Sequence, residues 1–187
     1  MVDNQLIENL NTVWPSPAQK KKIVIIGAGG VVSDAHLPAY KNGGYQVSGI
    51  YDPLSDKATK CAENFAIQKT YINLEEALQE KNVIFDVAVP PDVLLDVVRK
   101  IPAKSICQFQ KPLGNDLDEA REIVRLVKEK KIIACVNLQL KFSPMMLALR
   151  DAIEKNMIGK ITDLEVSLAV STPWHLWPFM EQLDHVE

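Results

Sequence analysis

The residues best suited to chemistry lie around a glycine-rich turn near residue 27. The stretch KIVIIGAGGVV begins with a short apolar run, and Gly27, Gly29 and Gly30 follow that run directly. In a strand–turn–helix unit, Gly27 permits the tight turn and Gly29 lets the backbone approach a pyrophosphate, while the first helical N–H groups, near Val31, point toward the phosphates. Counting GxGxxG from Gly27 puts Val32 at the third glycine position, so we expect the helix to pack less closely on its strand.

A carboxylate follows the second apolar run. Asp52 lies 25 residues after Gly27, where it can accept hydrogen bonds from the hydroxyls of an adenosine ribose. Asp52 would repel a 2′-phosphate on that ribose, and the next residues, Pro53 and Leu54, offer no basic side chain to offset the repulsion. The turn and this acid therefore predict NAD as the cofactor, with NADP less favoured. A glycine turn with a purely structural role is the alternative.

A lysine follows the fifth apolar run, in the segment FQKPLG at residues 109–114. Ligands of doubly wound sheets bind outside the carboxyl ends of the strands, so we expect Lys111 to stand in the binding crevice, with Pro112 restraining its backbone. A lysine there could orient a substrate hydroxyl and assist the transfer of its proton. The alternative is a solvated loop lysine, and the residues Gln-Lys-Pro at 110–112, taken alone, favour this alternative.

Short apolar runs alternate with helical patterns along the chain. The runs cover about 22–27, 46–51, 84–89, 104–109 and 132–138, and we expect parallel strands buried on both faces, including the cysteines at 107 and 135. Apolar residues at helical spacing predict helices near 94–101 and 120–127, the second of which opens with Asp116 and Glu119 as a capping box. The pattern predicts an α/β fold, a Rossmann-like doubly wound parallel sheet.

Composition excludes several classes of protein. The chain has 187 residues and a net charge of −3, and its apolar runs are far shorter than the roughly 20 residues of a membrane span. The N-terminus has no signal-peptide pattern, which favours a cytoplasmic location. The sequence lacks a basic stripe with interleaved aromatic residues, which is the pattern that would indicate nucleic-acid binding. Three cysteines without CxxC spacing, and a lone His36 at a helix boundary, argue against a metal site.

Several segments, taken in their order along the chain, resemble a known family, the glucose-fructose oxidoreductase, inositol dehydrogenase and MocA group of NAD(P)-dependent oxidoreductases. The resemblance runs from about residue 22 to residue 161 and rests on IIGAGGVVSDAHLPAY, YDP, VAVPP, QKPLG, KFSP and NMIGKI. Residues 1–20, with Pro15 and Pro17, are expected to be a lead-in. The resemblance implies a Rossmann domain over 21–137 and an incomplete α+β domain over 138–187. In the family the sheet of that second domain forms one wall of the substrate site and often a dimer interface, so we expect a homo-oligomer when it is complete.

The resemblance also implies an activity and residue roles. The activity is hydride transfer between a nicotinamide cofactor and a secondary alcohol of a sugar, a cyclitol or a derivative. Lys111 matches the lysine of the family's Glu-Lys-Pro motif, which contacts both substrate and nicotinamide. Pro90, in VAVPP, and Gln110 are assigned to the cofactor site on the same ground.

Three departures from the family pattern bear on activity. Gln110 stands where the motif has a glutamate, and Leu94 stands where the family has a histidine near the cofactor. The family's remaining catalytic aspartate and histidine lie four residues apart on a helix of the second domain. The adjacent Asp184 and His185 do not match that spacing, so we expect the chain alone to show little or no turnover.

Aromatic residues near the C-terminal end provide the last candidates. Trp174 and His175 could line a sugar pocket, because aromatic faces pack on sugar rings, but tryptophans packed in an ordinary loop are the favoured alternative. Two functions remain for the chain. The first is an NAD-dependent oxidoreductase acting on a sugar or cyclitol; the second is a dinucleotide-binding module without turnover, such as a sensor, a regulatory subunit or an inactive fragment.

Overall fold

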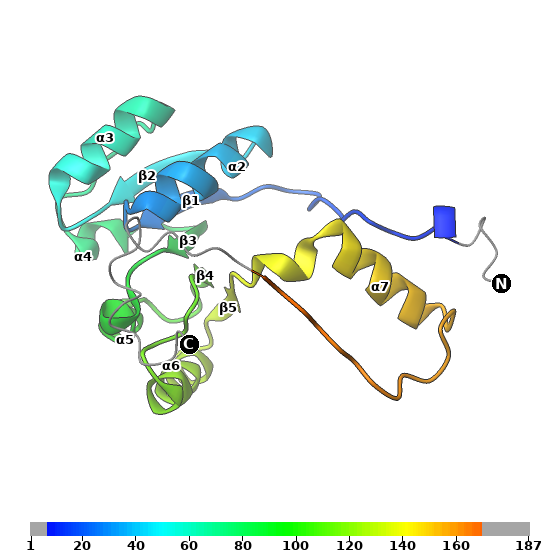
Figure 1. Ribbon diagram of the computed structural model, residues 1–187. Helices are drawn as coiled ribbons and strands as arrows, with labels where there is room; N and C mark the ends of the chain where they lie inside the picture. Colours follow the sequence, from blue (N-terminus) through cyan, green and yellow to red (C-terminus); the bar gives the residue numbers. More distant parts are fainter. Residues whose placement is uncertain (1–6, 170–187) are drawn as a thin grey trace. The chain divides into compact units, whose positions relative to one another are not determined.

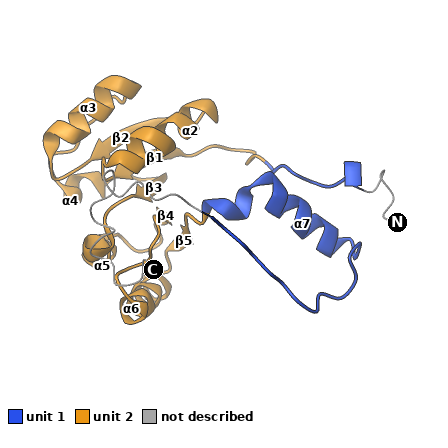
Figure 2. Ribbon diagram, viewed as in Figure 1, with its two compact units in different colours: residues 1–15, 139–187 blue, residues 16–138 orange. Residues whose placement is uncertain are grey.

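The chain divides into two compact units (Figure 2). The structure is a computed structural model and describes residues 7–169. Residues 16–138 form one unit, called here the sheet unit, and residues 1–15 and 139–187 belong to the other. All the described residues that the sequence places at the cofactor site lie in the sheet unit.

Five parallel strands form the sheet (Figure 1). They are β1 (Lys22–Ile26), β2 (Val47–Tyr51), β3 (Val83–Val87), β4 (Ile106–Phe109) and β5 (Ile133–Val136), and their spatial order is β2-β1-β3-β4-β5. The predicted Rossmann-like α/β fold is confirmed. Because β1 lies between β2 and β3, the strand order reverses there, and the carboxyl end of β1 lies at the point where doubly wound folds bind ligands.

Helices connect the strands. A π-helical segment, η1 (Val32–His36), runs into α2 (Leu37–Asn42) after β1; α3 (Ser55–Phe65) and α4 (Leu74–Ala77) follow β2; α5 (Pro91–Lys100) follows β3; and α6 (Leu117–Glu129) follows β4. The helices predicted near 94–101 and 120–127 are confirmed as α5 and α6. The predicted cap of α6 also forms, because Asp116 Oδ1 lies 2.8 Å from the Glu119 N–H nitrogen, while Glu119 accepts the N–H of Asn115 at 2.6 Å.

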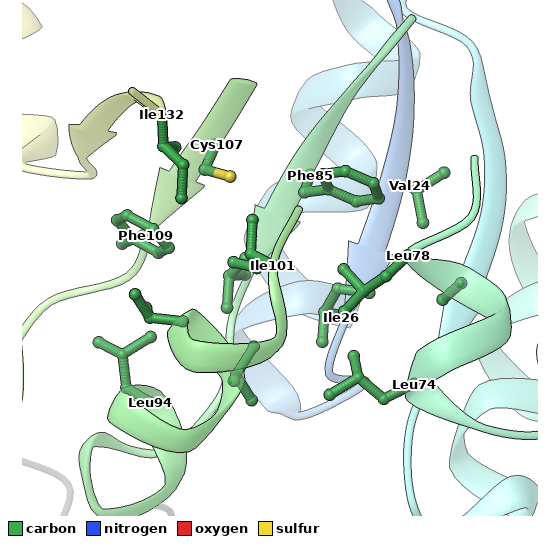
Figure 3. Close-up of a cluster of buried hydrophobic side chains, with 14 of the residues drawn as sticks. Val24, Ile26, Leu74, Leu78, Phe85, Leu94, Ile101, Cys107, Phe109 and Ile132 are labelled. Carbon is green, nitrogen blue, oxygen red and sulfur yellow. The ribbon is translucent and has the colours of Figure 1, made fainter. Parts of the chain in front are cut away.

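Two apolar clusters cover the two faces of the sheet. One includes Phe85 and Phe109 of the strands together with Leu94 and Ile101, from α5 and its C-terminal end (Figure 3). The other lies beneath η1, α2 and α3, with Ile25, Val32, Leu37, Ile50 and Ala58 among its buried members. Burial of this apolar surface fixes β1, β3 and β4, so the loops at their carboxyl ends start from rigid positions.

The prediction that every strand is buried on both faces is wrong for β5. Ile133 is 67% exposed, and Cys135 is exposed whereas Cys107 is buried. In the described structure β5 is an edge strand, hydrogen-bonded to β4 alone. An apolar run does not distinguish an edge strand from a central one, since both carry β-branched residues.

The second unit contains a short 3-10 helix, η2 (Gln139–Phe142), and α7 (Pro144–Glu154). Its N-terminal segment packs on these elements: the Asn11 N–H donates to Asp151 Oδ2 at 2.8 Å, and the rings of Trp14 and Phe142 meet edge to face at 5.1 Å. Residues 162–169, which follow the NMIGKI segment, form no strand. A strand needs a paired neighbour, and the described part of this unit supplies none. Across residues 7–169, no helix has both the length and the hydropathy of a membrane span.

Candidate functional site

The glycine turn follows β1 at the carboxyl edge of the sheet. Gly27 has a φ of 106°, and a Cβ added there would lie 2.3 Å from the carbonyl oxygen of Ala88, in the loop after β3. Only glycine fits between these two backbones. At Gly29 an added Cβ would meet no atom of the described structure within 4 Å. The turn therefore packs tightly against the loop after β3 at Gly27, whereas at Gly29 it leaves space for a ligand.

The helix after the turn starts at Gly30 and contains a π turn. The N–H of Leu37 donates to the carbonyl of Val32, five residues earlier, which defines that turn. Val32 is fully buried at the position where the motif has its third glycine. The first N–H groups of a helix, here those of Gly30 and Val31, have no carbonyl partner within it and can donate to an anion.

Asp52 follows β2 and hydrogen-bonds to the glycine turn. Its Oδ2 accepts the N–H of Ala28 at 2.7 Å, and its Oδ1 accepts the N–H of Leu54 at 2.8 Å. Each carboxylate oxygen has further acceptor capacity, so the half-buried group can still accept a pair of hydroxyl donors. The acid predicted to bind ribose thus lies directly beside the turn predicted to bind phosphate.

Gln110 and Lys111 follow β4, which is separated from β2 by β1 and β3. The Gln110 N–H donates to the carbonyl of Val87 at 3.0 Å, which joins the ends of β3 and β4. Lys111 is exposed, its ammonium has no ion-pair or hydrogen-bond partner among residues 7–169, and its peptide bond to Pro112 is cis. Pro90, also exposed, precedes α5 in the loop after β3. These residues occupy the same edge of the sheet as the glycine turn.

Leu94, which stands where the family has a histidine, belongs to the core. It is 1% exposed and lies in the apolar cluster between the sheet and α5 (Figure 3). A leucine in that cluster contributes to packing and offers no polar contact to a cofactor.

A buried polar network at the same edge was missed by the sequence analysis. His36 Nδ1 lies 2.7 Å from Asp86 Oδ2, and the Tyr40 hydroxyl donates to the same oxygen at 2.9 Å. Burial, and then the neighbouring Asp86, raises the pKa of the Tyr40 phenol, so Tyr40 remains a donor. His36 is itself buried, and not the boundary histidine that the sequence suggested. The signal was Asp86: a carboxylate inside a buried strand needs partners.

The structure does not describe the C-terminal residues named in the sequence analysis. Trp174 and His175, and likewise Asp184 and His185, fall outside the described residues. Within residues 7–169, no group of three or more His, Cys, Asp or Glu side chains is placed to hold a metal ion.

Comparisons with known proteins agree with this geometry. The family model of the Gfo/Idh/MocA oxidoreductases, described as an oxidoreductase family with an NAD-binding Rossmann fold, matches residues 21–138. The uncharacterized protein YMR315W of Saccharomyces cerevisiae is 28% identical over 137 residues, which cover 70% of this chain and 39% of that protein. The chain thus spans about two fifths of this relative's length.

Two solved structures share the fold. The WlbA dehydrogenase of Chromobacterium violaceum, in complex with NADH and UDP-GlcNAcA, has a TM-score of 0.63 at 15% identity, covering 79% of this chain and 44% of its own. A super-repressor mutant of Gal80p from Saccharomyces cerevisiae has a TM-score of 0.66 at 18% identity, covering 75% and 40%. With its sheet order, its glycine turn and a family match over most of its length, the chain belongs to the Gfo/Idh/MocA oxidoreductase family, and residues 21–138 are the NAD-binding Rossmann part.

Proposed function

We propose that the protein is an NAD-dependent oxidoreductase that transfers a hydride between the nicotinamide ring and a secondary alcohol of a sugar, a cyclitol or a derivative. One observation carries the proposal: the open backbone at Gly29 lies in the same turn that Asp52 holds by its hydrogen bond to Ala28. A backbone segment that can bind phosphate and a carboxylate that can bind ribose therefore adjoin each other, as a dinucleotide requires.

The residues of this edge fit a dinucleotide. Gly27, Gly29, Gly30 and Val31 would hold the pyrophosphate through backbone contacts, since the Gly29 backbone is open and the helix begins at the next residue. Asp52 would accept both hydroxyls of the adenosine ribose. A 2′-phosphate would face its negative charge, which supports NAD over NADP.

Gln110, Lys111 and Pro90 would adjoin the nicotinamide end, because they follow β3 and β4 beyond the switch point. When bound, the nicotinamide ring accepts or supplies the hydride. The Lys111 ammonium would donate a hydrogen bond to the reacting oxygen and hold it in place. A neutral lysine amine would instead accept the hydroxyl proton during oxidation, and the ammonium would return it during reduction.

The substrate class rests on likeness to relatives. WlbA is crystallised with a sugar nucleotide, UDP-GlcNAcA, and with NADH. We propose a related sugar or cyclitol here, with Trp174 and His175 contributing to its pocket, a cytoplasmic location, and a homo-oligomer formed through the sheet of a second domain. That domain would begin at residue 138. The chain spans only about two fifths of the length of YMR315W.

A dinucleotide-binding module without turnover is the second candidate. Two observations favour it: Gln110 replaces the glutamate of the Glu-Lys-Pro motif, and the similar Gal80p structure is named as that of a super-repressor mutant. In this alternative the Rossmann edge binds the dinucleotide, and no residue assists a proton transfer.

Calorimetric titration with NAD and with NADP tests the cofactor, and NADH formation with a panel of sugars and inositols tests the activity. We expect NAD to bind more tightly than NADP, and turnover to require the second domain. Absence of NAD binding would overturn both candidates. Tight NAD binding without turnover by a chain that includes the second domain would favour the module.

A further inference from the structure

The two ring nitrogens of His36 face different kinds of partner. Nδ1 lies 2.7 Å from Asp86 Oδ2, a carboxylate oxygen that can only accept when ionised. Nε2 lies 3.3 Å from Gln110 Nε2 and 3.3 Å from Asn137 Nδ2, both amide nitrogens. Asp86 is fully buried and His36 is 7% exposed, so bulk water does not replace these contacts.

The orientation of the Gln110 amide is fixed by a separate contact. Gln110 Oε1 accepts the backbone N–H of Lys111 at 2.9 Å, so the NH₂ group is the one that faces the imidazole. An amide NH₂ can only donate, and His36 Nε2 must therefore present its lone pair. The ring proton then lies on Nδ1, where it is donated to Asp86.

We propose that His36 is a positioning residue, held as the neutral Nδ1–H tautomer, that links buried Asp86 to the Gln110 amide and thereby fixes the backbone of Lys111. The link matters for catalysis only if Lys111 contacts substrate, so this part rests on the proposed function. It begins at β3 with Asp86, crosses η1 at His36 and ends after β4 at Lys111. The buried carboxylate thus restrains an exposed lysine through two side chains.

The other titratable groups around the ring are few. From α2, Tyr40 shares Asp86 Oδ2 with His36, and its raised pKa keeps it protonated. From β5, the thiol of Cys135 has a raised pKa, because it is partly desolvated and, second, because the Asp86 carboxylate lies nearby. Lys111 follows Gln110 in the chain. Among the described groups, Asp86 is the anion that contacts the imidazole ring. A second carboxylate placed beside Nε2 would accept a hydrogen bond there, so it would favour an imidazole protonated on both nitrogens.

Nitrogen NMR of the ¹⁵N-histidine-labelled chain tests the tautomer. We expect a protonated Nδ1 and an unprotonated Nε2 for His36 at neutral pH, the signal being assigned by its loss in His36→Asn. In Gln110→Glu both nitrogens become protonated, whereas the control Gln79→Glu, which adds the same charge at an exposed helix end, leaves the parent pattern. An Nε2–H tautomer in the parent protein, or an unchanged ring in Gln110→Glu, would overturn the proposal.

Amide exchange tests the positioning role. His36→Asn retains a donor for Asp86 but removes the acceptor for Gln110, so the β3 amides should keep their protection while the Lys111 amide exchanges about fivefold faster. Unchanged exchange at Lys111 would overturn the link. The two readouts need no cofactor, so NAD titration of the parent remains a separate measurement: failure to bind would refute the proposed function, and the NMR results alone would still decide the link through His36.

Discussion

Asp52 Oδ2 accepts the backbone N–H of Ala28 at 2.7 Å, so the acid at the end of β2 is tied to the glycine turn after β1. Two segments 24 residues apart thereby keep a fixed spacing at the carboxyl edge of the sheet. In a bound dinucleotide the ribose and the pyrophosphate also have a fixed spacing. The hydrogen bond therefore organises the site before any ligand enters, which reduces the ordering that binding must impose.

Asp52→Ala should weaken NAD binding about tenfold, because hydrogen bonds to a charged group contribute about 1.5 kcal/mol or more. NADP binding should change less, since the charge that repels the 2′-phosphate is also lost. The affinity ratio of NAD to NADP therefore falls. Calorimetry with both dinucleotides measures that ratio in parent and mutant.

Asp56→Ala is the matched control for Asp52→Ala, because Asp56 is an exposed aspartate in the first turn of α3 and, among residues 7–169, makes no hydrogen bond to the glycine turn. Its affinity ratio should equal that of the parent. A melting temperature for each variant separates the lost Ala28 contact from lost binding. A parent protein that prefers NADP would refute the role given to Asp52.

The two glycines of the turn should respond in opposite ways. Gly29→Val has open space for its side chain and should leave the fold intact while abolishing NAD binding, since the side chain enters the space proposed for the pyrophosphate. Gly27→Ala should lose about 1–3 kcal/mol of stability from its φ of 106° alone, with a further loss from the contact to Ala88. Urea unfolding and NAD titration of both variants test the contrast. Full NAD affinity in Gly29→Val would mean that the glycines serve only the turn.

The three cysteines should differ in their reaction with iodoacetamide. Cys135 is exposed and should be alkylated first, whereas Cys61 and Cys107 are buried, and burial raises the pKa of Cys107 to about 12. Partial desolvation, and then Asp86, also raises the pKa of Cys135 above its ordinary value. Its thiolate is therefore scarce at neutral pH, and the rate should still be rising above about pH 8.5.

Mass spectrometry of the intact alkylated chain follows this reaction, and Cys135→Ser should remove the fast phase. Labelling of Cys107 as fast as of Cys135 would contradict the burial of β4. A rate that levels off near pH 7 would contradict the raised pKa of Cys135.

The sheet could be predicted from the sequence because each strand, β5 included, lies in a short apolar run, and helical patterns separate these runs. Burial on both faces favours such runs, and the glycine turn and Asp52 follow two of them, so their shared edge follows from topology alone. The exposure of β5 could not be foreseen, since it depends on which elements cover the last strand.

The His36 network could not be predicted because its members are far apart in the chain. His36 and Asp86 are 50 residues apart, and His36 and Asn137 are 101 apart. A π turn, which no sequence pattern indicated, places His36 in the interior. Asp86 inside an apolar strand indicated that a buried partner exists, but not which residue it is.

Lys111→Met should separate catalysis from cofactor binding. The substitution removes the ammonium proposed to hold and protonate the reacting oxygen but keeps much of the side-chain volume. Positioned acid–base assistance typically contributes about 10²–10⁴ in rate, so turnover by a chain that includes the second domain should fall by that factor. NAD affinity should change little, because the glycine turn and Asp52 are untouched.

Lys128→Met is the control for the lost charge, since Lys128 is an exposed lysine in the last turn of α6. It should keep the parent's rate and its NAD affinity. Initial rates of NADH formation and calorimetric affinities, measured for the parent and both variants, give the comparison. Equal turnover by Lys111→Met and the parent would refute the catalytic role of Lys111, and an equal fall in both variants would attribute the loss to net charge, since the two substitutions share only that change.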